Sequence, residues 1–271
     1  MSRIATRFTA LRQQHRRALI PYLCAGDPSP ALTVPLLHAL VAAGADILEL
    51  GVPFSDPMAD GPVIQRATER ALRHGVRLSD VLAMVRTFRE QDTATPVVLM
   101  GYLNPVEAMG YDTFATQAAA VGVDGALIVD APPEEAGDLA AALRTRGLDL
   151  IYLIAPTSTS ERIARICQAA SGFVYYVSVK GVTGSGQLDT DAVAARLAEI
   201  RTVTDLPLGV GFGIKDADSA ARVAQVADAV IVGSALVSRI EARLANPLSL
   251  LEDLPFFLKS LRRAVDSGYP G

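Results

Sequence analysis

Glu49 and Asp60 are the residues of this chain whose type and setting best suit proton transfer. Glu49 lies near the end of an apolar segment, residues 45–51, and Asp60 lies on the following loop, which is rich in proline and glycine. A carboxylate at the end of a buried strand loses hydration, which raises its pKa and prepares it to give or take a proton. Because burying a carboxylate for packing alone is costly, we predict that Glu49 and Asp60 are catalytic.

Both carboxylates also have structural interpretations. Glu49 could pair with a buried arginine or lysine, although no basic residue lies on the neighbouring predicted strand ends. Asp60 could be a turn residue before Gly61. Asp130, at the end of another apolar segment, would be a third carboxylate in the same layer. The choice depends on the elements that position these side chains.

Strand-like and helix-like segments alternate along the chain. The intervals between the strands place apolar residues three and four positions apart, as in helices that pack against a sheet. Eight repeats predict an α/β fold, a single-domain (β/α)8 TIM barrel over residues 1–271, with an open doubly wound sheet as the alternative. The predicted strands are continuous apolar runs, typical of parallel strands covered on both faces: 18–25, 45–51, 96–102, 125–129, 150–155, 173–179, 207–211 and 229–232.

Further helices are expected outside the eight repeats. A capping helix at about residues 2–14 would use Ile4, Phe8 and Leu11 to seal the base of the barrel. Extra helices are expected between the second and third strands and after the eighth. In such a barrel the catalytic residues lie at the carboxyl ends of the strands, which is where Glu49 falls.

Glycine-rich turns follow the last three predicted strands. Gly184 lies in the first turn, Gly213 in the second, and Gly233 and Ser234 open the helix after the third. Glycine lets backbone N–H groups approach an anion closely, and a helix that begins at Ser234 adds the positive end of its dipole. The turns therefore predict a phosphate site without a lysine, unless the glycines serve only tight packing.

Three tyrosines lie in or end predicted strands, namely Tyr22, Tyr102 and Tyr175. Each could line a pocket for a flat aromatic substrate or belong to the core.

The composition favours a small-molecule partner. Of the 271 residues 50% are hydrophobic and 20% charged, and the formal net charge is -4, without the basic stripes that nucleic acids or anionic membranes require. No apolar run reaches the ~18 residues of a membrane span. Neither the two cysteines nor the three histidines, which fall on predicted helices, have the spacing of metal ligands, so no metal is expected. Buried thiols and the lack of a secretory signal predict a cytoplasmic protein.

The motifs, taken in order, resemble those of the tryptophan synthase α subunit family along nearly the whole chain. They are Gly-Asp-Pro at 26–28, Glu-Leu-Gly-Val-Pro-Phe-Ser-Asp-Pro at 49–57, Ala-Asp-Gly-Pro at 59–62, Gly-Val-Thr-Gly at 181–184, Gly-Phe-Gly-Ile at 211–214 and Val-Gly-Ser-Ala at 232–235. The resemblance implies a lyase of tryptophan biosynthesis that cleaves indole-3-glycerol phosphate to indole and glyceraldehyde 3-phosphate in a retro-aldol reaction. It implies no cofactor in this chain.

The resemblance also implies roles for individual residues. Glu49 would serve as general acid and also as base, while Asp60 would hold the indole N–H and stabilise the developing positive charge. The loops carrying Asp60 and Thr183 would close over the site. The residues implied to contact the substrate, through backbone amides for the phosphate or side chains beside the ring, are Phe212, Tyr175, Thr183, Gly184, Gly213, Gly233 and Ser234.

A partner is implied as well, the tryptophan synthase β subunit, which carries pyridoxal phosphate and receives indole through a tunnel in an α2β2 heterotetramer. Pro53, Asp56 and Asn104 are candidate contact positions. The chain departs from the family pattern after Gly184, where residues 185–187 (Ser-Gly-Gln) stand in place of a longer loop with an arginine. We expect this difference to affect lid closure and its coupling to the β subunit.

Other functions are compatible with parts of the pattern. Another sugar-phosphate barrel, an isomerase or epimerase, would use similar carboxylates and glycine turns, but an epimerase would need metal-ligand histidines at strand ends. A non-catalytic activating barrel subunit would not need a desolvated Glu49. A stand-alone indole-3-glycerol-phosphate lyase would use the same residues, and the sequence does not separate it from the α subunit.

Overall fold

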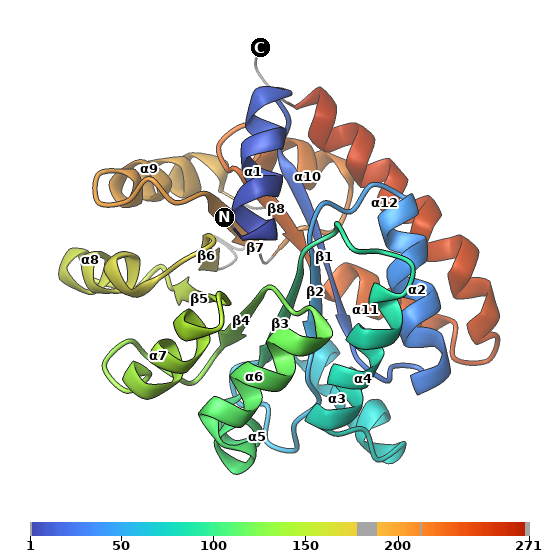
Figure 1. The fold of residues 1–271 in the computed structure, drawn as a ribbon. Helices are drawn as coiled ribbons and strands as arrows, with labels where there is room; N and C mark the ends of the chain where they lie inside the picture. The colour runs from blue at the N-terminus through green and yellow to red at the C-terminus, as the bar shows by residue number, and fades with distance from the viewer. Residues whose placement is uncertain (1, 178–188, 212, 269–271) are drawn as a thin grey trace.

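The computed structural model describes residues 2–177, 189–211 and 213–268. Within these residues eight parallel strands close into a barrel in sequence order, with β8 paired to β1 (Figure 1). This confirms the predicted TIM barrel and excludes the open sheet. The strands are β1 Ala18–Cys24, β2 Leu48–Gly51, β3 Val97–Gly101, β4 Gly125–Ile128, β5 Asp149–Ile154, β6 Val174–Val177, β7 Leu208–Gly211 and β8 Ala229–Val232.

Helices surround the barrel (Figure 1). Two helices lie between β2 and β3, and two α-helices and a short 3-10 helix follow β8. Their bounds are α1 Arg3–Gln13, α2 Pro30–Ala42, α3 Pro62–Arg73, α4 Leu78–Arg89, α5 Leu103–Met109, α6 Tyr111–Val121, α7 Gly137–Thr145, α8 Ser160–Ala169, α9 Thr190–Arg201, α10 Ala217–Ala224, α11 Ser234–Ala242, η1 Pro247–Ser249 and α12 Leu250–Ser267.

The short helix α5, between β3 and β4, was not expected from the sequence. Pro105 lies in its first turn, where proline is tolerated because the N–H groups there have no partner within the helix. Gly110 then separates α5 from α6 with a φ of 86°, a conformation that glycine adopts easily. A proline and a glycine so close together are typical of a loop, which is why the helix was missed.

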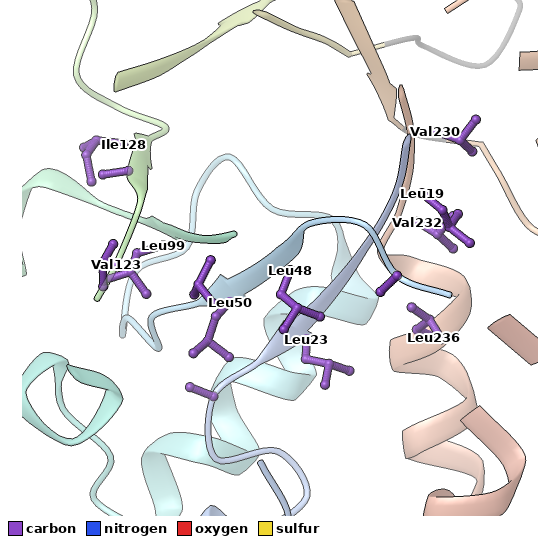
Figure 2. Packing of buried hydrophobic residues seen from close by; sticks show 14 of the residues in the cluster. Leu19, Leu23, Leu48, Leu50, Leu99, Val123, Ile128, Val230, Val232 and Leu236 are labelled. Carbon is purple, nitrogen blue, oxygen red and sulfur yellow. The ribbon is translucent and has the colours of Figure 1, made fainter. Parts of the chain in front are cut away.

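The core has an outer and an inner layer. Leu48, Leu50 and Leu99 point outward from the strands toward the helices, in the cluster shown in Figure 2. The inner layer fills the barrel. There Phe173, the residue before β6, packs against Phe8 of α1 with ring centroids 5.9 Å apart. Ile4, Phe8 and Leu11 are buried in this layer, so α1 covers the base of the barrel.

A hydrogen-bonded motif recurs at alternate strand junctions of the base. Each pair joins a first residue near the start of an odd-numbered strand to a second residue just before the next, even-numbered strand. The backbone N–H of the second residue donates to the carbonyl of the first. The side chain of the second residue accepts the backbone N–H of the first. This double contact ties neighbouring strands at one level. In the described residues the pairs are Leu19–Asp46, Val97–Asp124, Leu150–Ser171 and Leu208–Asp228, with N···O distances of 2.8–3.0 Å.

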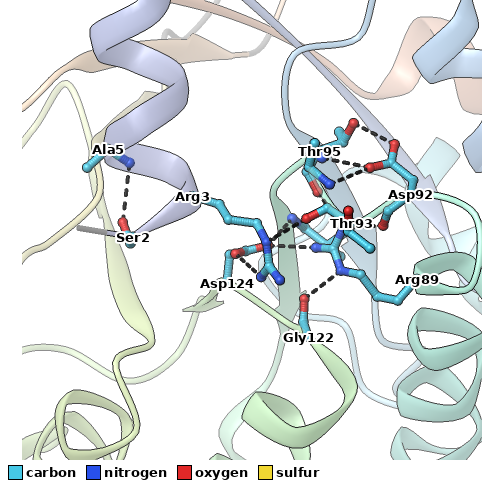
Figure 3. Close-up of polar contacts among 11 residues, drawn as sticks. Ser2, Arg3, Ala5, Arg89, Asp92, Thr93, Thr95, Gly122 and Asp124 are labelled. Atoms are coloured by element: carbon cyan, nitrogen blue, oxygen red, sulfur yellow. Dashed lines mark hydrogen bonds and ion pairs between the residues drawn. The ribbon is translucent and has the colours of Figure 1, made fainter.

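Arginines neutralise the aspartates of this motif. Asp124 lies between Arg3 and Arg89, with N···O distances of 2.9 and 2.7 Å (Figure 3). Asp46 is paired with Arg262 of α12 at 2.8 Å. The acidic residues buried at the base are therefore structural, in contrast to Glu49 at the opposite end.

Candidate active site

The alternation of β2 turns Glu49 into the barrel. Leu48 and Leu50 belong to the outer core and Ile47 to the inner core, so Glu49 shares the inward face with Ile47. There it borders a cavity of about 140 Å³ at the carboxyl ends of the strands. The described residues that line the cavity are Tyr22, Glu49, Ala59, Asp60, Gly61, Ile64, Met100, Val129, Leu153, Tyr175, Val177, Gly213, Ile214, Ile231, Gly233 and Ser234.

Glu49 differs from the other buried carboxylates of the described residues. Asp27, Asp46 and Asp124 are each paired with an arginine. Glu49 is only 2% exposed, yet its Oε1 has no hydrogen-bond partner. The structural interpretation, pairing with a buried base, therefore finds no support in the described chain.

Burial sets the protonation state of Glu49. Loss of hydration, with a smaller contribution from the negative charge of Asp60, raises the pKa of Glu49 from 4.5 to about 8. At neutral pH the side chain is therefore mostly protonated, as a general acid must be, and it is close enough to its pKa to act as a base in a later step.

Asp60 is held by Tyr102 of the β3–α5 junction. The Tyr102 hydroxyl donates a hydrogen bond to Asp60 Oδ2 at 3.0 Å and accepts one from the backbone N–H of Ala59 at 3.0 Å. Phe54 stacks on the Tyr102 ring at a centroid distance of 5.0 Å. Burial raises the pKa of Asp60, and the Tyr102 hydrogen bond opposes that rise. These contacts fix the carboxylate more closely than a simple turn would.

The glycine turns meet the cavity on the side of β7 and β8. Gly213, whose φ is 79°, and Gly233 both line it, and α11 begins at Ser234 on its wall. The first N–H groups of a helix have no acceptor within the helix and lie at the positive end of its dipole. This wall can therefore hold an anion. Thr183, Gly184 and Phe212, also predicted to bind substrate, lie outside the described residues.

The apolar part of the cavity wall was not predicted residue by residue. Met100, Val129, Leu153 and Ile231 each lie two positions after an inner-core residue, as the last inward-facing position on the carboxyl side of the strand or just past it. Counting alternate positions from the inner core would have found them. Together they make part of the cavity wall apolar, which suits an aromatic ring.

Comparisons with known proteins agree with this geometry. A family model described as tryptophan synthase alpha chain matches residues 8–266. The chain belongs to the tryptophan synthase alpha chain family. The alpha chain of Thioalkalivibrio sulfidiphilus is 67% identical over 266 residues, covering 98% of this chain and 100% of the relative. That of Nitrosococcus oceani is 62% identical over 267 residues, covering 98% of each.

Solved structures of the family have the same fold. Tryptophan synthase subunit alpha of Legionella pneumophila is 49% identical with a TM-score of 0.93, covering 98% of this chain and 99% of that one. A Mycobacterium tuberculosis tryptophan synthase chain, in an aminoacrylate-bound form, is 40% identical with a TM-score of 0.86, covering 98% and 100%. At these identities the likeness extends beyond the fold to the family.

Other predicted positions of this tryptophan synthase alpha chain family member lie outside the cavity. Asp130 is exposed, and its Oδ1 accepts the N–H of Leu103 at 2.8 Å, so it caps the start of α5. Asp56 and Asn104 are exposed, whereas Pro53 is buried. Asp130 and Asp56 also border a second, open hollow of about 590 Å³.

Two kinds of feature are absent from the described residues. No cluster of three or more His, Cys, Asp or Glu side chains there could hold a metal ion. None of the described helices is both long and apolar enough to cross a membrane.

Proposed function

We propose that Glu49 and Asp60 cleave indole-3-glycerol phosphate, the reaction of the tryptophan synthase alpha chain family, to which this lyase belongs. The observation that carries the proposal is Glu49, a buried carboxyl that no cation of the described residues pairs with and that faces the same cavity as Asp60. The glycine turns of β7 and β8 bound that cavity on another side. A ring and a phosphate can therefore occupy different parts of one chamber.

The reaction needs one proton to be given and one to be taken. Glu49, protonated at neutral pH, donates its proton to C3 of the indole, and the ring becomes a positively charged electron sink. Glu49 then accepts the proton of the hydroxyl on the adjacent glycerol carbon. The carbon–carbon bond breaks, its electron pair returns to the ring, and the aldehyde of glyceraldehyde 3-phosphate forms. Indole leaves and Glu49 is protonated again.

Asp60 would stabilise the charged ring. Because Tyr102 occupies Oδ2, Oδ1 of the carboxylate is available to accept the indole N–H. The negative charge of Asp60 then lies beside the nitrogen where positive charge develops, which lowers the barrier. Backbone amides near Gly184, Gly213, Gly233 and Ser234 would bind the phosphate and so position the ring against Glu49. Thr183, Phe212 and Tyr175 would border the substrate.

No cofactor or metal is proposed for this chain, because the protonated indole ring itself accepts the electron pair of the breaking bond. We further propose a β subunit partner that holds pyridoxal phosphate, in an α2β2 heterotetramer of the cytoplasm. The exposed Asp56 and Asn104, together with Met58, 84% exposed beside the open hollow, support this face as the contact.

The test is indole release from indole-3-glycerol phosphate by the wild type, Glu49→Gln and Asp130→Asn, with and without a tryptophan synthase β subunit. The wild type should release indole slowly and faster with the partner, Glu49→Gln should release none, and Asp130→Asn should match the wild type without the partner. Fast release unaided by the partner indicates a stand-alone lyase. Release by Glu49→Gln contradicts the assignment, and partner activation without any indole release indicates a non-catalytic subunit.

A further inference from the structure

Helix α3 determines where Asp60 lies. The helix begins at Pro62, its N-cap is Gly61, and Asp60 directly precedes that N-cap. The preceding stretch, residues 52–61, contains neither helix nor strand. Gln65, in the first turns of α3, donates its side-chain amide to the Asp60 carbonyl at 2.9 Å. Any shift of α3 is therefore transmitted to the catalytic carboxylate.

Packing alone provides little to hold α3 in place. A cluster that includes part of the cavity wall contains Ile64, Ala67 and Ala71 of α3, with Tyr22 and Cys24 of β1 and Val237 of α11. Two of the three buried apolar side chains that α3 contributes are alanines, which bury little surface and interdigitate poorly with a neighbour. The helix could slide on this face unless a directional contact fixed it.

Arg70 supplies such a contact near the other end of α3. Its Nε and Nη2 donate to the two carboxylate oxygens of Asp27, at 2.7 and 2.9 Å, in a bidentate pair on the turn after β1. The Asp27 side chain is fully buried and that of Arg70 is 12% exposed. Gly26 brings the turn so close that a Cβ there would lie 2.6 Å from Val76 Cγ2, just beyond α3.

The same network reaches α11, which packs beside α3 (Figure 1). Arg70 Nη1 donates to Glu241 Oε1 at 3.2 Å, and Arg66 donates to both oxygens of Glu241 at 2.6 and 2.8 Å. Glu241 lies near the end of α11, whose first residue is Ser234. Because Arg66 of α3 alone can hold Glu241, loss of Arg70 should release α3 from the turn after β1 and leave its contact with α11 in place.

We propose that Arg70 is a positioning residue for the cleavage reaction, which holds α3, and through it Asp60, against β1 and its following turn. The inference rests on the proposed function, in which Asp60 stabilises the charged ring. Arg70 is not among the described residues that line the cavity. Its effect on turnover should therefore pass mainly through Asp60.

The test is a double-mutant cycle in the full chain, with kcat and KM for indole-3-glycerol phosphate measured for the wild type, Arg70→Lys, Asp60→Asn and the double variant. Lysine keeps the charge of Arg70 and loses the bidentate geometry. A displaced catalytic group costs rate more than binding, so Arg70→Lys should lower kcat about tenfold with KM changed less than about threefold. In the Asp60→Asn background the same change should lower kcat less than about twofold.

Arg262→Lys is the matched control, because Arg262 forms a buried pair with Asp46 at the opposite end of the barrel. It should lower the melting temperature and leave kcat within about twofold of the wild type, since it does not touch the site. If Arg70→Lys does not fold, Asp27→Asn weakens the same pair from the other side and should give the same pattern. Arg66→Lys tests the contact between α3 and Glu241 of α11 separately from the Arg70–Asp27 pair. This variant should have a higher kcat than Arg70→Lys.

Several outcomes overturn the inference. Rate losses that multiply in the double variant, an unchanged kcat in Arg70→Lys, or an equal loss of kcat in Arg262→Lys would each show that Arg70 does not act through Asp60. Failure of the proposed function is recognised separately, because the wild type would then release no indole or Glu49→Gln would remain active.

Discussion

Surroundings, rather than residue type, separate the catalytic candidates from the structural acids. Asp46 and Asp124 at the base are buried beside arginines and accept strand N–H groups. Glu49 is equally buried but has no cation beside it in the described part of the chain, so its charged form is destabilised. A buried carboxyl that stays protonated at neutral pH and has no ion pair contributes little to stability. Glu49 is therefore the strongest candidate for a catalytic residue among the buried carboxylates of the described chain.

The pH dependence of kcat/KM should report Glu49 and Asp60 together. Glu49 must be protonated to donate, so kcat/KM should fall as the pH rises through about 8. Asp60 must be ionised, so kcat/KM should also fall in acid, at a pH above the ordinary range of an aspartate because burial raises its pKa. Measuring kcat/KM from pH 4 to about 10 checks this, because kcat/KM reports the ionisable groups of the free enzyme. An activity that keeps rising above pH 9 or so would contradict Glu49 as the acid.

Tyr102→Phe should weaken the stabilisation of the charged ring by Asp60 without removing the carboxylate. The variant loses the hydrogen bond to Asp60 Oδ2, while the ring can still stack on Phe54. Because that hydrogen bond lowers the pKa of Asp60, its loss should move the acidic limb of kcat/KM to higher pH and reduce the maximal kcat/KM about tenfold.

Tyr152→Phe is the control for Tyr102→Phe, since Tyr152 is buried in the outer core away from the cavity. Its pH profile should match that of the wild type. An unchanged acidic limb in Tyr102→Phe would show that the hydroxyl does not tune Asp60.

Among the elements, the strands were predictable and the contacts between loops were not. Continuous apolar runs marked the strands, and the alternation of side-chain direction along β2 places Glu49 on the inward face. The sequence did not reveal α5, because Pro105 and Gly110 resemble loop signals. Nor could it pair Tyr102 with Asp60 or Arg70 with Asp27, since such contacts join segments far apart in the chain and depend on how helices settle on the barrel.

Asp130→Ala should destabilise α5 and spare the chemistry. The change removes the acceptor of the Leu103 N–H at the start of this helix, and loss of a comparable cap costs about 1 kcal/mol. Urea unfolding should show that loss, while indole release without a partner should stay within about twofold of the wild type, because Asp130 does not line the cavity. A large loss of unaided activity would place Asp130 in the catalytic site after all.

The contacts that stabilise the barrel and the proposed active site lie at opposite ends of the molecule. The base has α1, paired aspartates and the recurring strand motif, all of which satisfy buried polar groups. The mouth has an unpaired carboxyl and glycine turns, which add little to stability. The site should therefore lower the stability of the whole barrel by an amount that depends on pH.

Glu49→Gln should make the whole protein more resistant to unfolding at high pH, even though it abolishes turnover. Below pH 4.5 the Glu49 carboxyl is protonated in both states and contributes no pH dependence. Above that value the unfolded chain loses the proton while the folded chain keeps it, so stability falls as the pH rises and levels off above about 8. The full difference is on the order of 5 kcal/mol. Urea unfolding at pH 5, 7 and about 9 should thus show a difference in the free energy of unfolding between Glu49→Gln and wild type, a gap that widens with pH.

Glu69→Gln, which removes an exposed carboxylate from α3, is the control for the loss of one charge. A gap that stays constant with pH would mean that Glu49 is ionised in the folded protein, and it would remove the basis for its role as the acid.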